Sequence, residues 1–220
     1  MTCYVNVDRI SKSFGEQKIL DNVSIRFETT KIYGITGRNG SGKTILLKML
    51  CGLMCPECGT ITIDGKTIGK DVDFPESVGA IIESPGFLPY WSGYKNLTYL
   101  ASLRNRIGAA EICDAMKLLE LNPHDKKPVG RYSLGMKQRL GLAQAIMENP
   151  RLLILDEPMN GLDADSACRI RNLLKKMRDG GKTIILASHI QEDLLVLCDE
   201  IYELNEGCLR PIPLSHVQLR

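Results

Sequence analysis

The sequence predicts an α/β fold in which a parallel central sheet is flanked by helices. Three observations predict it. Residues 32–50 read as a strand, a glycine-rich turn and a helix in immediate succession. The run at 152–155 is continuously apolar, as expected for a central parallel strand that is covered on both faces. Between them, residues 84–149 carry three helical patterns and few β-rich runs, which indicates a helical insertion.

Length and composition are consistent with one domain. A chain of 220 residues can bury one generous core, or a core with a subdomain. The formal net charge is only +2, which gives no support to nucleic-acid binding. No apolar run reaches about 18 residues and the N-terminus lacks a signal-peptide pattern, so we expect a cytosolic protein that does not itself span a membrane. We predict a single domain, 1–220, made of an α/β core (1–83 with 150–220) and a helical subdomain (84–149).

The first part of the chain predicts a small antiparallel β layer. Residues 4–10 and 23–27 alternate as half-buried strands, and the sequence at 13–16 reads as a turn. Phe14 at the tip of this turn could stack on an adenine ring, or it could be a partly buried turn aromatic. The local sequence favours both interpretations equally.

The glycine-rich turn at 37–44, GRNGSGKT, fits the phosphate-loop pattern G-x-x-x-x-G-K-[ST]. Its glycines let the backbone curl until successive N–H groups point at one anion, and the following helix adds the positive end of its dipole. Lys43 can reach the β- and γ-phosphates, and the Thr44 hydroxyl can ligate Mg²⁺. The predicted nucleotide-binding residues are Gly37, Arg38, Asn39, Gly40, Ser41, Gly42, Lys43, Thr44 and Ile45.

Periodicity and turn signals predict the remaining elements. We expect strands at 60–63, 78–82, 183–187 and 201–204, and helices at 94–105, 109–121, 134–148, 164–178 and 190–198.

Two acids stand at the carboxyl end of the apolar strand at 152–155. Asp156 fits a ligand of the Mg²⁺ shell, and Glu157 is positioned to accept a proton from an attacking water. The alternative interpretation is that the two acids are simply solvated at the strand end, and the nearby phosphate loop makes that interpretation less favoured. The predicted reaction is in-line attack of water on the γ-phosphate, that is, ATP hydrolysis.

Together these motifs resemble those of the ATP-binding subunit of an ABC transporter, a P-loop NTPase of the ABC type. They occur in the family's order: an aromatic at Phe14, the phosphate loop, YSLGMKQRL at 132–140, LLILDEP at 152–158, MNGLD at 159–163, and Ser188-His189. The helical insertion lies where the family keeps its helical subdomain. The resemblance implies an ATPase that powers a separate membrane permease.

The resemblance also implies a head-to-tail homodimer with ATP at the interface. Ser133 and Gly135 would then bind the γ-phosphate held by the other subunit, which suits a serine and exposed N–H groups at a helix N-terminus. His189 would contact the γ-phosphate and help to orient the water. Asp163 is expected to cap a helix and to make a contact across the dimer.

Two positions depart from the family's usual pattern. The signature stretch has Leu134 where most members carry a first glycine, while Ser133 and Gly135 remain. Glu83 stands where the family usually has a glutamine, and a carboxylate there can still ligate Mg²⁺. The stretch around Glu83 resembles the subgroup that exports, or confers immunity to, bacitracin- and lantibiotic-type antimicrobial peptides.

The aromatic stretch at 87–94 lies where the family docks its permease. We expect docking near Phe87, Tyr90 and Trp91, with Trp91 as the candidate exposed contact; Phe87 and Tyr94 could equally be core residues of the helical subdomain. Such docking implies a cytoplasmic protein bound peripherally to the inner face of the cell membrane.

Other hypotheses remain open. A soluble ABC-type ATPase of DNA repair or translation is one alternative to the transport subunit. Eight cysteines also raise the hypothesis of a zinc or redox module at Cys55 and Cys58, with Cys51 as a third ligand. No second Cys-x-x-Cys or His pair completes a zinc site, so an ordinary turn is the favoured interpretation.

Overall fold

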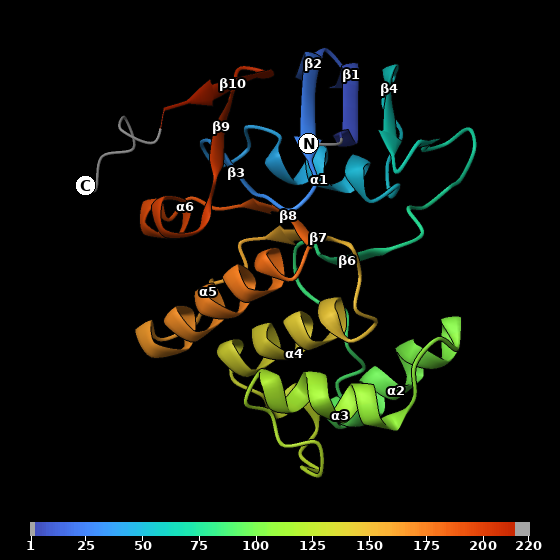
Figure 1. Cartoon of the computed structure of the whole chain (residues 1–220), viewed down its shortest axis with the longest axis vertical. Coiled ribbons are helices and arrows are strands. Elements are labelled where there is room, and N and C mark those ends of the chain that lie inside the picture. Colours follow the sequence, from blue (N-terminus) through green and yellow to red (C-terminus); the bar gives the residue numbers. More distant parts are fainter. Residues whose placement is uncertain (1–2, 214–220) are drawn as a thin grey trace.

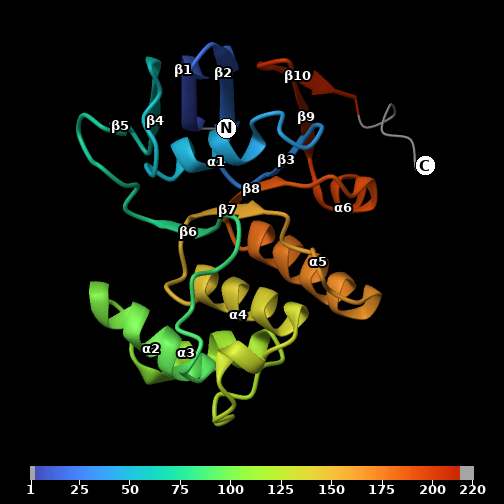
Figure 2. The same ribbon diagram turned by 180° about the vertical axis from the view of Figure 1, so that it is seen from behind.

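The computed structural model describes residues 3–213 and has three layers (Figure 1). A small antiparallel sheet lies at one end, a larger mixed sheet crosses the middle, and a group of helices forms the other end. Helix α1 (Lys43–Leu50) lies between the two sheets, and the view from behind shows the same order (Figure 2). No helix within 3–213 is both long enough and apolar enough to cross a membrane.

The antiparallel sheet has the order β2-β1-β4-β5. Its strands are β1 (Cys3–Phe14), β2 (Gln17–Glu28), β4 (Cys58–Ile63) and β5 (Lys66–Thr67). Strands β1 and β2 form a hairpin in which Phe14 pairs with Gln17. Both are longer than predicted, because pairing continues to the two turn residues Gly15 and Glu16.

The mixed sheet has the order β10-β9-β3-β8-β7-β6. Its strands are β3 (Ile32–Thr36), β6 (Val78–Ile81), β7 (Leu152–Asp156), β8 (Thr183–Ala187), β9 (Glu200–Asn205) and β10 (Cys208–Ile212). Neighbours from β9 to β6 are parallel, and only β10 pairs antiparallel. The carboxyl ends of β3 and β7 therefore point to the same edge of the sheet.

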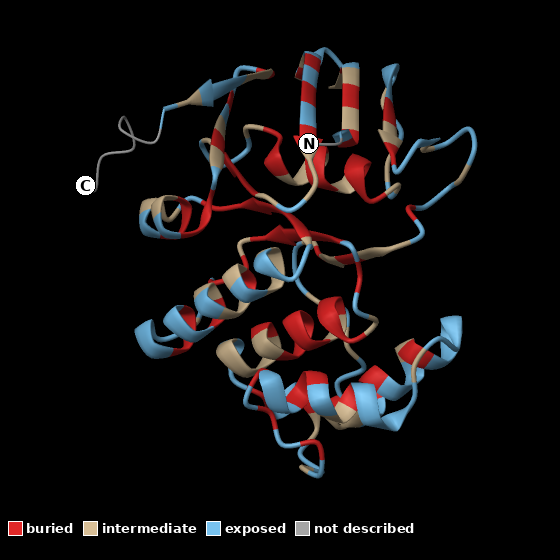
Figure 3. Ribbon diagram, viewed as in Figure 1, coloured by how far each residue is buried: buried red, intermediate tan, exposed pale blue. Residues whose placement is uncertain are grey.

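Alternating side chains of the central strands serve two hydrophobic cores. Leu152 and Ile154 of β7 face α1 and the antiparallel sheet, whereas Leu153 and Leu155 face the helices of the other layer. Every residue of β7 and β8 is buried, as Figure 3 shows for the middle of the molecule. The sequence prediction of a parallel central sheet with helices on both faces and a small antiparallel layer is confirmed.

Helices α2 (Gly93–Arg104), α3 (Ala109–Leu118) and α4 (Leu134–Ile146) fall within 84–149, with a short 3₁₀ turn at Val129–Arg131. Helix α4 approaches β6 closely, since a Cβ added to Gly79 would lie 1.8 Å from the carbonyl oxygen of Ala145. The division into core and helical subdomain stays a prediction, and its outermost residues, 1–2 and 214–220, lie outside the described part.

The remaining helices are α5 (Ala164–Asp179) and α6 (Gln191–Leu197). Helix α3 ends three residues before the predicted Leu121, because Glu120 turns into the left-handed region with φ +55°. Strands β5 and β10 were not predicted. The first has two residues, and the second contains Pro211, which an edge strand tolerates.

Candidate active site

The phosphate-loop segment joins β3 to α1 at the sheet edge. Gly42 precedes α1 with φ +103°, and no side chain caps the helix. A Cβ at Gly37 would lie 2.3 Å from the carbonyl oxygen of Leu204, and one at Gly42 would lie 2.8 Å from Cγ2 of Ile19. The loop thus fits only with glycine at these two positions, and it leaves the first N–H groups of α1 free of a side-chain cap.

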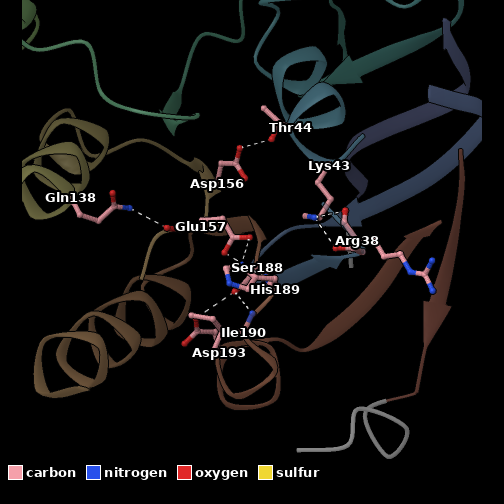
Figure 4. Close-up of polar contacts among 11 residues, drawn as sticks. Arg38, Lys43, Thr44, Gln138, Asp156, Glu157, Ser188, His189, Ile190 and Asp193 are labelled. Atoms are coloured by element: carbon pink, nitrogen blue, oxygen red, sulfur yellow. Dashed lines mark hydrogen bonds and ion pairs between the residues drawn. The ribbon is translucent and has the colours of Figure 1, made fainter. Parts of the chain in front are cut away.

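Lys43 is buried and folds over this loop. Its Nζ donates to the carbonyl oxygens of Gly37 at 2.7 Å and Arg38 at 3.1 Å (Figure 4). No carboxylate of the described residues forms an ion pair with it. The Ser41 hydroxyl is also buried without a hydrogen-bond partner among residues 3–213. A buried cation and a spare hydroxyl beside free amides suit an anionic ligand.

Thr44 and Asp156 meet across the edge of the sheet. The Thr44 hydroxyl donates to Oδ2 of Asp156 at 2.7 Å, and the aspartate is buried at the end of β7. A hydroxyl and a carboxylate are oxygen ligands of the kind that Mg²⁺ takes beside phosphate groups. These two residues therefore fit the Mg²⁺ that the sequence predicts.

Glu157 is held on several sides. Its N–H donates to the carbonyl oxygen of Ala187 at 2.9 Å, and its carbonyl oxygen accepts from the Gln138 side chain at 3.1 Å. Oε1 lies 2.8 Å from Nδ1 of His189, and the backbone N–H of His189 donates to Oε2 at 3.4 Å (Figure 4). Contacts from α4 and β8 thus hold the backbone of Glu157, and His189 in the loop after β8 orients its carboxylate.

A cleft of about 430 Å³ brings most of these groups together. Phe14 and Ile19 form its apolar side, and the phosphate loop with the two acids forms its polar side; the lining includes Asn39, Gly40, Gly42, Lys43, Thr44, Ile45, Asp156 and Glu157. The Phe14 side chain is half exposed and lines the cleft, so its stacking on an adenine ring stays a prediction beside the partly buried turn aromatic. An aromatic ring opposite an anion site suits a nucleotide.

The remaining predicted residues lie outside this cleft. Ser133 caps α4 by accepting from the N–H of Met136 at 3.2 Å, and Gly135 follows in the first turn. Asp163 caps α5 through the N–H of Ser166 at 2.8 Å, and this backbone hydrogen bond, together with one from the Ser166 hydroxyl, lowers the pKa of Asp163. Ser133 and Asp163 therefore cap helices of this chain, and both side chains are exposed, so they can also face another molecule.

Glu83 lies in a neighbouring recess of about 280 Å³, which Asp156 and Glu157 also line. Its carboxylate pairs with Lys48 rather than with the phosphate loop. Leu134 and Lys137, at the start of α4, border the same recess.

Sequence reasoning missed Ile19, Lys48 and Gln138. The hairpin register could have indicated Ile19, which lies two residues beyond the partner of Phe14. Gln138 is buried within the predicted helix at 134–148, where a buried polar residue signals a specific hydrogen bond. No local pattern points to Lys48.

The cysteines do not gather around a site. Cys55 and Cys58 are exposed, whereas Cys51 is buried, and burial raises its pKa to about 12. Within 3–213 no group of three or more His, Cys, Asp or Glu side chains could hold a metal ion.

Comparisons with known proteins agree with this geometry. The family profile described as ABC transporter matches residues 20–160. An uncharacterized ABC transporter ATP-binding protein of Bacillus subtilis, YybJ, is 42% identical over 93% of this chain and 94% of its own length. The bacitracin transport ATP-binding protein BcrA of Enterococcus faecalis is 39% identical over 95% and 68%, and the lantibiotic transport ATP-binding protein SrtF of Streptococcus pyogenes is 34% identical over 92% and 87%.

Solved structures share the fold. A dimeric ATP-binding cassette, MJ0796, described in a post-hydrolysis state with ADP and Pi, superposes with a TM-score of 0.86 at 23% identity, covering 96% of this chain and 98% of the other. A nucleotide-free ATP-binding cassette from an ABC transporter gives 0.81 at 23% identity, covering 94% and 90%.

Proposed function

Because this chain belongs to the ABC transporter family, as one of its ATP-binding proteins, we propose that it hydrolyses ATP in the cleft beside Phe14 and powers a separate membrane permease. The observation that carries the proposal is the convergence of three groups on one cleft. They are the phosphate loop, the Thr44–Asp156 pair and the Glu157 carboxylate that His189 holds.

Binding would use the groups that the cleft presents. The amides of the loop and the start of α1 receive the phosphates, and the Lys43 ammonium leaves its two carbonyl partners to neutralise them. The ring of Phe14 stacks on the adenine, with Ile19 beside it. Thr44 and Asp156 would hold Mg²⁺, and the chemistry that this ion would supply is neutralisation of charge on the phosphate oxygens.

Hydrolysis would depend on Glu157 as the general base. Its carboxylate takes a proton from water while the water oxygen forms a bond to the γ-phosphorus and the bond to the ADP oxygen breaks. The products are ADP and phosphate. His189, with Nδ1–H donating to Oε1, fixes the orientation of the carboxylate before the reaction.

ABC ATP-binding subunits dimerise and work with a membrane permease. For this chain we propose a head-to-tail homodimer in which Ser133, Gly135 and Asp163 contact ATP bound by the partner, or the partner itself. The position of these residues outside their own cleft supports this arrangement, because a helix N-terminus with an exposed serine suits a phosphate that approaches from outside.

The proposed cargo is a peptide antibiotic, which the chain would export or to which it would confer immunity. The names of BcrA and SrtF, which refer to bacitracin and lantibiotic transport, support this choice. The same names do not favour a soluble ATPase of DNA repair or translation. We propose a cytoplasmic position at the inner face of the membrane, with the permease seated near Phe87, Tyr90 and Trp91.

The decisive variant is Glu157→Gln. It keeps the shape of the side chain and removes the base, so ATP binding should persist while phosphate release falls at least about a hundredfold and a dimer accumulates in size-exclusion chromatography with ATP. Glu148→Gln, two residues after the end of α4 and outside the residues that line the cleft, is the matched control. Near-normal turnover in Glu157→Gln would remove Glu157 as the base.

The transport role needs its own experiment. A host that is sensitive to bacitracin and lantibiotics expresses this chain together with a candidate permease. Control cultures of the same host express this chain alone or the permease alone. Raised resistance only when both are present, and its loss with Glu157→Gln, is the expected result. Hydrolysis by the purified chain without any gain in resistance to either class would overturn the proposed cargo while leaving the ATPase intact.

A further inference from the structure

A buried carboxylate lies behind His189 and has no part in the reaction described above. Asp193, in the first turn of α6, is 1% exposed. Its Oδ1 accepts from Nε of Arg171 in α5 at 2.8 Å and lies 2.7 Å from Nη2 of the same guanidinium. Its Oδ2 faces the Ser188 hydroxyl at 3.4 Å (Figure 4). One carboxylate thus joins two helices to the residue before His189.

Ser188 in turn fixes the backbone on both sides of His189. Its N–H donates to the carbonyl oxygen of Ile35 in β3 at 3.2 Å, so the end of β8 is held in the sheet. Its hydroxyl oxygen accepts from the N–H of Ile190 at 3.1 Å, which closes a tight turn around His189. The imidazole lies on the open side of this turn, 2.8 Å from Glu157.

The cost of this arrangement argues for a purpose. Desolvating a carboxylate and a guanidinium is unfavourable, and a buried ion pair repays that cost only with good geometry and further hydrogen bonds. An apolar pair would pack α5 against α6 equally well. Beyond its pairing with Arg171 and its place in the first turn of α6, Asp193 does one thing that an apolar residue cannot, which is to accept a hydrogen bond from the Ser188 hydroxyl.

We infer that Asp193 is a positioning residue: anchored by Arg171, it sets the Ser188 hydroxyl, which holds the turn that keeps His189 in contact with Glu157. The inference rests on the proposed function, since it concerns the orientation of Glu157, the base that takes a proton from the attacking water.

A purely structural role makes a different prediction. Glu192 and Asp193 both lie in the first turn of α6, where an acid stabilises the helix, and both pair with Arg171. The Glu192 side chain is largely exposed, and it pairs with Arg171 rather than with Ser188. Glu192→Gln is therefore the matched control for Asp193→Asn.

The test compares kcat and KM for ATP in these two variants and in Ser188→Ala. Asp193→Asn and Ser188→Ala should each lower kcat about tenfold with KM within about twofold, because a small misplacement of the base costs rate more than binding. Glu192→Gln should stay near wild type. In the Ser188→Ala background, Asp193→Asn should lower kcat by less than about a further twofold, because the two substitutions break the same contact.

A second measurement follows the turn itself. Amide hydrogen exchange at Ile190 should be faster in Asp193→Asn than in Glu192→Gln, while exchange in β7 stays unchanged. If Asp193→Asn fails to fold, the kcat and exchange of Ser188→Ala decide alone.

Three results would overturn the inference. They are an equal loss of kcat in Glu192→Gln, multiplicative losses in the double variant, or unchanged exchange at Ile190. Wild-type protein without ATP hydrolysis, in contrast, would refute the proposed function, and the exchange measurement would still report whether Asp193 holds the turn.

Discussion

Nζ of Lys48 lies 2.7 Å from Oε1 of Glu83, and this ion pair ties the segment after β6 to the helix that follows the phosphate loop. Lys48 lies one helical turn after Thr44, so the lysine places a positive charge next to the predicted Mg²⁺ ligand. Glu83 itself has a left-handed backbone with φ +58°. The lysine thus balances the negative charge that a glutamate adds where the family usually has a glutamine.

The Lys48–Glu83 ion pair leads to a prediction about Glu83. Glu83→Ala should lower the rate of Mg²⁺-ATP hydrolysis about tenfold and change ATP affinity less, because the carboxylate would act on Mg²⁺ or water after it leaves Lys48. Phosphate release measured against Mg²⁺ concentration checks this, with Lys48→Met as the control that removes only the partner. A rate in Glu83→Ala equal to that of wild type, with and without permease, would show that the position is passive.

The part of the site that was predictable consists of local patterns. The loop at 37–44 and the acids after β7 are each read from a few consecutive residues, because the strand before them sets their place at the sheet edge. The cap at Asp163 is also predictable from a local pattern, an acid just before a helical run, and Asp163 caps α5 as expected.

The part that was missed depends on contacts across the fold. Glu83 and Lys48 are 35 residues apart, and Asp193 reaches Arg171 over 22. A charged residue on an expected helix gives no sign of which distant residue it will pair with. Strand β10 was missed because its pairing with β9 outweighs the weak strand signal of a segment with Pro211.

The aromatic stretch also shows this limit. Trp91, the candidate exposed contact, is half-buried and packs edge-on against Tyr99, with ring centroids 5.7 Å apart and Lys95 above its face. Tyr90 is 90% exposed instead, and Phe87 packs against the core. Sequence placed aromatics in this segment, but only packing decides which of them faces solvent.

This exposure leads to a prediction about docking. Tyr90→Ala should weaken permease binding at least about tenfold, because a large exposed aromatic is a typical interface anchor, and it should leave ATP hydrolysis by the isolated chain unchanged. Tyr99→Ala removes an aromatic on α2 that also supports Trp91, so it should weaken binding and lower stability together. Pull-down with the permease and thermal unfolding of the free chain separate the two effects. Normal permease binding by Tyr90→Ala would exclude Tyr90 as the anchor.

The last prediction concerns the thiols and decides between a metal site and an ordinary turn. Burial raises the pKa of Cys51 to about 12 and also raises that of Cys198, so neither forms an appreciable amount of thiolate at pH 8. In the folded protein, iodoacetamide at pH 8 should therefore label the exposed Cys55 and Cys58 and spare Cys51, and all three should react in urea. Mass spectrometry of the peptides measures this directly. Stoichiometric zinc in the purified protein, lost in Cys58→Ser and protecting Cys55 from labelling, would contradict the prediction and support the metal site.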